Sequence, residues 1–125
     1  MPPRGAILNK STKRDQMRKI ETQMNAAIRD SKDWKSTNTM VSNADGVSFV
    51  FLHGNCIAQI GDTFVRLFDG GWQSNTTKSR LNAILAEHGC PGEFVFQKNF
   101  EWFVNMKNAK GENISVPFFS GMRLN

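Results

Sequence analysis

The chain has few cysteines and no long apolar run, and each shortage excludes a class of protein. Two cysteines in 125 residues, Cys56 and Cys90, are too few for a disulfide framework, so we expect free thiols, as in a reducing cytosol. No run of about 18 apolar residues occurs, which argues against a membrane-spanning helix and a membrane partner. The N-terminus lacks the apolar stretch of a secretory signal. We therefore expect one domain that stays in the compartment where it is made.

The positive charge of the chain is confined to its N-terminus. The net charge is +5, and residues 1–19 carry that whole excess, six basic residues against Asp15. Residues 20–125 carry ten basic and ten acidic residues and are neutral. The six basic residues are Arg4, Lys10, Lys13, Arg14, Arg18 and Lys19. Such a segment can neutralise nucleic-acid phosphates without reading a base sequence.

Two prolines, a glycine and no periodicity predict that residues 1–12 form a disordered basic arm. A helix is predicted over residues 13–35, with Ser11 or Thr12 able to cap it. Its apolar residues recur every three or four positions and form a stripe of Met17, Ile20, Met24 and Ile28. If the helix packs on its own domain, the stripe is core. If it projects, the stripe is a homodimer seam or a docking surface for a protein partner.

From residue 36 the apolar period changes from 3.6 to 2, which predicts an α+β domain over residues 36–125. Turn residues at 43–46 and 53–55 separate predicted strands at 37–42, 47–52, 56–60 and 63–68. A helix at 78–88, closed by Gly89, precedes a hairpin at 93–97 and 99–105 and an edge strand at 114–118. The predicted fold is α+β: an antiparallel β-sheet with one packed helix and an N-terminal basic helix and arm.

No catalytic or cofactor-binding motif is present, and we expect no enzyme, no cofactor and no bound metal. Zinc is the metal alternative, because His53-x-x-Cys56 and His88-x-Cys90 together offer four suitable ligands. A single intervening residue is an unusual ligand spacing, however, and Cys56 begins an apolar strand where a buried thiol is expected.

The segment before the second predicted helix is a candidate anion site. Helix-start amides, the hydroxyls of Ser74, Thr76 and Thr77, and the charges of Lys78 and Arg80 can together hold a phosphate. The plainer interpretation is a well-capped helix after a glycine turn, with two solvated cations. Both interpretations stay open from the sequence.

The chain has ten phenylalanines and three tryptophans but no tyrosine. Most of the rings alternate along predicted strands as core residues should, namely Phe49, Phe51, Phe64, Phe94 and Phe96. Trp72 and Phe100 adjoin turns, and Trp102 follows Phe100 by two positions. These three rings are candidate exposed platforms for stacking on bases.

Two stretches of the domain form a distinctive pattern. They are Val50-Phe-Leu-His-Gly-Asn-Cys-Ile-Ala58 and Gly70-Gly-Trp-Gln-Ser-Asn-Thr-Thr-Lys-Ser-Arg-Leu-Asn-Ala-Ile-Leu85. The pattern resembles a group of small tailed-bacteriophage proteins of unassigned function, over about residues 38–122. The resemblance implies a setting, the cytoplasm of an infected bacterial host, in which small phage proteins commonly bind nucleic acid or disable a host protein.

The leading hypothesis is a phage accessory protein that binds nucleic acid without catalysis. Its predicted phosphate contacts are the six basic residues of the N-terminus together with Lys78 and Arg80, and Trp72 is predicted to stack on a base. The alternative is an inhibitor of a host bacterial enzyme or defence factor, using the apolar stripe or the Trp72 surface. A small-anion binder at residues 74–80 is a third hypothesis.

Overall fold

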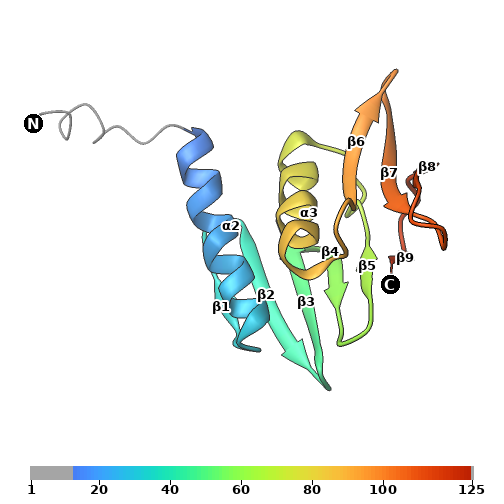
Figure 1. Cartoon of the computed structure of the whole chain (residues 1–125). Helices are drawn as coiled ribbons and strands as arrows, with labels where there is room; N and C mark the ends of the chain where they lie inside the picture. The colour runs from blue at the N-terminus through green and yellow to red at the C-terminus, as the bar shows by residue number, and fades with distance from the viewer. Residues whose placement is uncertain (1–12, 125) are drawn as a thin grey trace, which may run out of the picture.

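The computed structural model describes residues 13–124, with side chains from residue 17 onward. The predicted arm, residues 1–12, lies outside the described residues. Within them, two helices and two antiparallel sheets make up the fold, which confirms the predicted α+β class. Figure 1 shows the helices α2 (Lys13–Arg29) and α3 (Asn75–His88) side by side on the same side of the larger sheet.

The larger sheet has six strands in the order β1-β2-β3-β4-β5-β9. Their bounds are Trp34–Lys35, Thr39–Ala44, Val47–Leu52, Asn55–Ile60, Val65–Leu67 and Met122–Leu124. The four central strands were predicted to within a few residues, whereas the short edge strands β1 and β9 were not. Short edge strands are stabilised by a partner from elsewhere in the chain, so local sequence predicts them poorly.

Two tight turns set the register of this sheet. Asp45 and Gly46 link β2 to β3, and His53 and Gly54 link β3 to β4. All four residues have positive φ, between 52° and 81°. Two-residue hairpin turns of this twist require positive φ at both positions, which glycine adopts without a steric cost.

The smaller sheet has three strands, β6 (Phe94–Lys98), β7 (Glu101–Lys107) and β8 (Asn113–Pro117). The sequence predicted all three, with Pro117 in an edge strand, but within a single sheet. The side-chain amide of Asn82 in α3 both donates to and accepts from the backbone of Val95, at 2.9 and 2.6 Å, and so fastens β6 to the helix. Trp102 is buried on that side, so its prediction as an exposed platform is wrong.

The helix α2 ends at Arg29 and does not continue to residue 35. Ser31 takes a left-handed conformation with φ of 53°. Its amide donates to the carbonyl of Ile28, and the amide of Lys32 donates to the carbonyl of Ala27. These two bonds form a Schellman motif, which satisfies the last carbonyls and turns the chain away. Neither helix in the described part of the chain is long and apolar enough to cross a membrane.

The core lies between the helices and the sheets and is aliphatic. It contains valine, isoleucine and leucine from both sheets and from α3, with Met24 and Ile28 from α2 and a single ring, Trp102. None of the ten phenylalanines belongs to this buried set. The prediction that the alternating phenylalanines fill the core is therefore wrong, because period-2 alternation does not reveal which face of a strand is covered.

Candidate nucleic-acid interface

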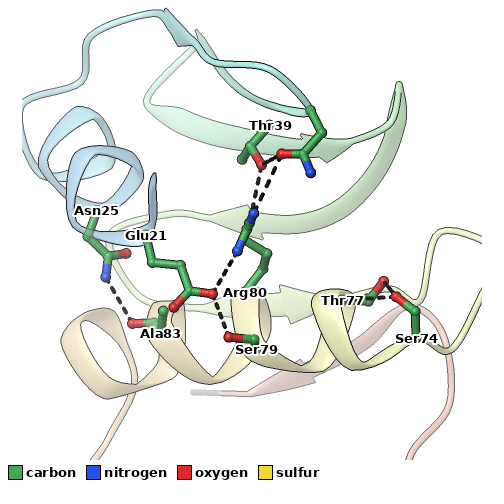
Figure 2. A network of polar contacts seen from close by, with 9 residues as sticks. Glu21, Asn25, Thr39, Ser74, Thr77, Ser79, Arg80 and Ala83 are labelled. Carbon is green, nitrogen blue, oxygen red and sulfur yellow. Dashed lines mark hydrogen bonds and ion pairs between the residues drawn. The ribbon is translucent and has the colours of Figure 1, made fainter. Parts of the chain in front are cut away.

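The two helices run parallel, and polar contacts between them repeat at a constant offset. Ser79 donates to Glu21, Asn25 donates to the carbonyl of Ala83, and Arg29 donates to Glu87, each pair being 58 positions apart. Figure 2 shows the first two of these contacts. One turn earlier, the same offset sets Met17 level with Asn75, the first residue of α3. The basic start of α2 therefore lies beside the N-terminus of α3.

Arg80 fastens the helices together from the interior. Its side chain is 1% exposed, and its Nη1 lies 2.8 Å from Oε2 of Glu21. Its Nε donates to Oγ1 of Thr39 in β2 at 3.2 Å (Figure 2). The predicted role of Arg80 as a surface phosphate contact is wrong, because the guanidinium is buried and already paired. The sequence gives no sign of this, since Glu21 is 59 positions away.

The apolar stripe of α2 packs on its own domain along most of its length. Met24 and Ile28 are buried in the core, while Met17 and Ile20, nearer the N-terminus, are half-buried. Of the two interpretations of the stripe, core packing therefore holds for Met24 and Ile28, which are unavailable to a partner. A contact with a partner chain through Met17 and Ile20 stays a prediction.

The start of α3 is a capped helix. The Ser74 hydroxyl accepts from the amide of Thr77 at 3.1 Å and lies 3.0 Å from the Thr77 hydroxyl, which donates to the carbonyl of Trp72 at 3.3 Å. Two of the three hydroxyls proposed for an anion cradle are thus engaged within the cap. The capped-helix interpretation describes what the residues do here, and the helix start by itself is not an anion site.

Cations and exposed rings gather at the end of the molecule where both helices begin. Figure 1 shows the N-terminal ends of α2 and α3 and the β6–β7 turn at the same end. Arg18 and Lys19 are exposed, and Lys78 is half-buried with its Nζ 3.4 Å from Oε1 of Gln97, near the end of β6. We call the surface formed by Arg18, Lys19, Trp72, Lys78 and Phe100 the basic end.

Trp72 is 75% exposed, in a loop whose backbone is internally bonded. Oδ1 of Asp69 accepts from the amide of Gly71 at 2.8 Å, and the carbonyl of Asp69 accepts from the amide of Trp72 at 3.2 Å. Gly70 and Gly71 both have positive φ, 68° and 85°. The predicted exposure of Trp72 is confirmed, and these bonds fix the loop that presents the indole to solvent.

Phe100 is 94% exposed, and its backbone is strained. It follows Asn99 in the two-residue turn between β6 and β7, with φ of 67°. Asn-Gly is the usual pair in such turns, because a bulky side chain at positive φ is unfavourable. A phenylalanine that contacts little of the fold and strains its own backbone contributes nothing evident to stability, which favours a role in contact with a ligand or partner.

The remaining predicted residues are placed as follows. Arg4 and Lys10 lie outside the described residues, and Lys13 and Arg14 lie in the first turn of α2, before its described side chains begin. His53 lies in the β3–β4 turn and His88 at the end of α3. Over residues 17–124, whose side chains the structure describes, no three side chains of histidine, cysteine or acidic type are grouped so that they could hold a metal ion.

Comparison with known proteins gives one match. No curated protein and no solved structure matches the chain. A family model described as Kyanoviridae Gp96 protein, a cyanophage family, matches residues 17–125. The match begins within α2, so it includes the helix that the phage resemblance had left out, and residues 1–16 precede it. The chain therefore belongs to the Kyanoviridae Gp96 family, a phage protein family of unassigned function.

Proposed function

We propose that this phage protein binds nucleic acid without catalysis, through the basic end and the basic residues that precede it, in the cytoplasm of the infected host. The observation that carries the proposal is the separation of charge. Residues 1–19 hold the whole excess of +5, and the helix that carries the end of this segment is fixed to the domain by the buried Glu21–Arg80 pair. Arg18 and Lys19 therefore occupy fixed positions on the domain, beside the other residues of the basic end.

Three physical effects favour an anionic polymer at this surface. Cations that neutralise phosphates release condensed counterions, which gives affinity without sequence preference. The N-termini of two parallel helices carry partial positive charge at the same end. Trp72 and Phe100 add exposed rings on which bases can stack, an interaction open to any base.

The test is fluorescence anisotropy of the full chain with labelled DNA and RNA at several salt concentrations. In a variant that changes Arg4, Lys10, Lys13, Arg14, Arg18 and Lys19 to glutamine, the slope of log affinity against log salt should fall by about 0.9 for each lost duplex phosphate contact. The control changes three exposed lysines away from the basic end, Lys32, Lys107 and Lys110, to glutamine and should keep the slope. The proposal is contradicted if the affinity does not change with salt concentration, or if the full chain does not bind at low salt.

One feature favours the alternative, a host bacterial protein as partner. On the smaller sheet, the rings of Phe94, Phe96 and Phe103 form a cluster with successive centroids 5.7 Å apart, and Phe94 is exposed. Exposed aromatic clusters are typical of protein interfaces. This candidate predicts a stoichiometric host protein that co-purifies after nuclease treatment and is lost from a Phe94→Ser variant.

A further inference from the structure

Among residues 13–124, both helices cover one face of the six-stranded sheet and leave the other face open, and we call this second face the open face. Thr39 marks the covered face, because its hydroxyl accepts from Arg80 of α3, and Val50 and Leu52 are buried on the same side. Side chains alternate between faces along a strand, so Met40, Phe49 and Phe51 point to the opposite face. Both described helices lie on the Thr39 side (Figure 1), so neither covers this second face.

The open face has more apolar residues than is usual for the solvent-exposed face of a sheet. An antiparallel sheet covered on one side normally places polar residues on the other. The outward residues of β3 are Val47, Phe49 and Phe51, and Met40 of β2 lies directly opposite Phe51. These four side chains are half-buried, so each is partly accessible from this face, and apolar groups gathered on the surface of a monomer often mark a binding site.

The charged residues within the strands of this sheet are all basic. The six strands contain three charged residues, Lys35, Arg66 and Arg123, and no acidic residue. Arg66 and Arg123 are direct cross-strand partners, an arrangement that is unfavourable between like charges. Nε of Arg66 is buried without a hydrogen bond, and the guanidinium of Arg123 lies over the Phe64 ring at 4.7 Å. Guanidinium groups form charge-assisted hydrogen bonds with phosphate oxygens, so the two arginines offer this face a phosphate contact.

The aromatic and basic residues share rows across the strands. One row runs from Phe49 through Gln59 to Arg66 and then Arg123. Since neighbouring strands lie about 4.8 Å apart, Phe49 and Arg66 are roughly 10 Å from each other. A second row runs from Lys35 through Met40 to Phe51.

The second row borders a cavity of about 290 Å³, whose other walls include residues 36–39, His53 and Gly54. This volume is at the small end of the range for ligand pockets, so it suits one planar group rather than a large ligand. A lysine at its edge can meet a phosphate, while Phe51 offers a ring for stacking.

We propose that the open face binds single-stranded nucleic acid, with Arg66 and Arg123 holding a phosphate, Phe49 and Phe51 stacking on bases, and one base entering the cavity beside Lys35. This inference rests on the proposed function and specifies the form of nucleic acid that the protein recognises. A duplex keeps its bases inside the stack, so rings on a sheet surface can reach them only in a single strand.

The experiment compares labelled oligothymidylate with its oligoadenylate duplex, using the full chain. Phe49→Leu and Phe51→Leu keep an apolar side chain but remove the ring, and each should weaken oligothymidylate binding about tenfold, with duplex affinity changed less than about twofold. Phe94→Leu, the same change on the other sheet, is the control. Arg66→Gln with Arg123→Gln should lower the salt slope for the single strand by about 0.7 per lost contact.

A second measurement does not depend on substitutions. Cys56 is the cross-strand partner of Phe51, so it lies on the open face, and Cys90 is exposed at the end of α3. Bound oligothymidylate should slow alkylation of Cys56 and leave that of Cys90 unchanged.

The outcomes separate the two proposals. If the full chain binds neither form of nucleic acid, the proposed function and this inference both fail. If it binds oligothymidylate but the leucine variants bind it as tightly as the wild type, or lose both forms equally, only the open-face site is overturned.

Discussion

Oε2 of Glu21 and Nη1 of Arg80 form a 2.8 Å ion pair that holds α2 against α3. The pair lies where the two helices meet β2. Arg80 also donates to Oγ1 of Thr39 and to Oδ1 of Asn38, and Ser79 donates to Oε2 of Glu21. Burial makes such a pair sensitive to the loss of either partner, because the other charge is then left without compensation. The placement of the basic end depends on this contact, since it fixes α2 to the domain.

Breaking the buried pair should destabilise the protein far more than breaking an exposed one. Glu21→Ala is expected to lower the free energy of unfolding by about 3 kcal/mol. Arg29→Ala is the control: it removes a pair to Glu87 between the same helices, also at 2.8 Å, whose side chains are 58% and 37% exposed. That loss should stay below about 1 kcal/mol. Urea unfolding measures both, and equal losses would contradict the assigned role of Arg80.

Replacing Phe100 with glycine should stabilise the fold. Glycine adopts a φ of 67° without strain and gives up few contacts there, because Phe100 is so exposed. We expect the free energy of unfolding to rise by about 1 kcal/mol. The same variant should bind nucleic acid more weakly if the ring belongs to the interface.

The converse change at a hairpin turn of the other sheet is the control for Phe100. Gly54→Ala places a side chain at φ of 81° and should lower the melting temperature. If Phe100→Gly instead lowered the melting temperature, the ring would have a packing role and the strain interpretation would be wrong.

His88 should make stability depend on pH in the mildly acidic range. Burial lowers the pKa of its imidazole, the neighbouring Glu87 opposes that shift, and Arg29 adds to it. The unfolded chain therefore takes up a proton at a higher pH than the folded chain. Stability is complete above the unfolded pKa, about 6.5, and is lost as the pH falls through the folded value. The test is the free energy of unfolding measured between about pH 8 and pH 5. In His88→Gln, which cannot titrate at this position, the free energy should depend less steeply on pH.

Cys56 should alkylate slowly near neutral pH. Burial raises the pKa of its thiol, which outweighs the hydrogen bonds that act in the opposite direction. Only the thiolate reacts, so the rate should continue to rise above the pH at which a free thiol such as glutathione levels off. Mass spectrometry after timed iodoacetamide labelling gives the alkylation rate at each pH. If the rate for Cys56 levels off at the same pH as that of glutathione, or at a lower pH, the raised pKa is contradicted.

Much of the secondary structure follows from local sequence. Gly46 and Gly54 provide the positive φ that the first two hairpins need, so β2, β3 and β4 could be predicted from turn residues and alternation. Gly89 and Pro91 likewise mark the end of α3. The start of α3 was predicted three residues late, because several residues from Ser74 onward can cap a helix and only the bond to Thr77 identifies the one that does.

The candidate site was predicted only in part. The basic N-terminal segment follows from the distribution of charge along the sequence, and the exposure of Trp72 follows from its place beside a glycine turn. Both could therefore be predicted. Arg80 was placed on the surface because nothing near it in sequence pairs with it. Phe49 and Phe51 were placed in the core because their strand is apolar on both faces, and the sequence does not say which face the helices cover.

The sequence by itself determined the charge separation, the turns and the periods of the helices and strands, because each depends on residues close together in the chain. Tertiary structure decided how the strands divide between two sheets, which face of the larger sheet is open, and that Arg80 is buried against Glu21. These features arise from contacts between residues distant in sequence, where burial and pairing outweigh the preference of a single residue for water or for the core.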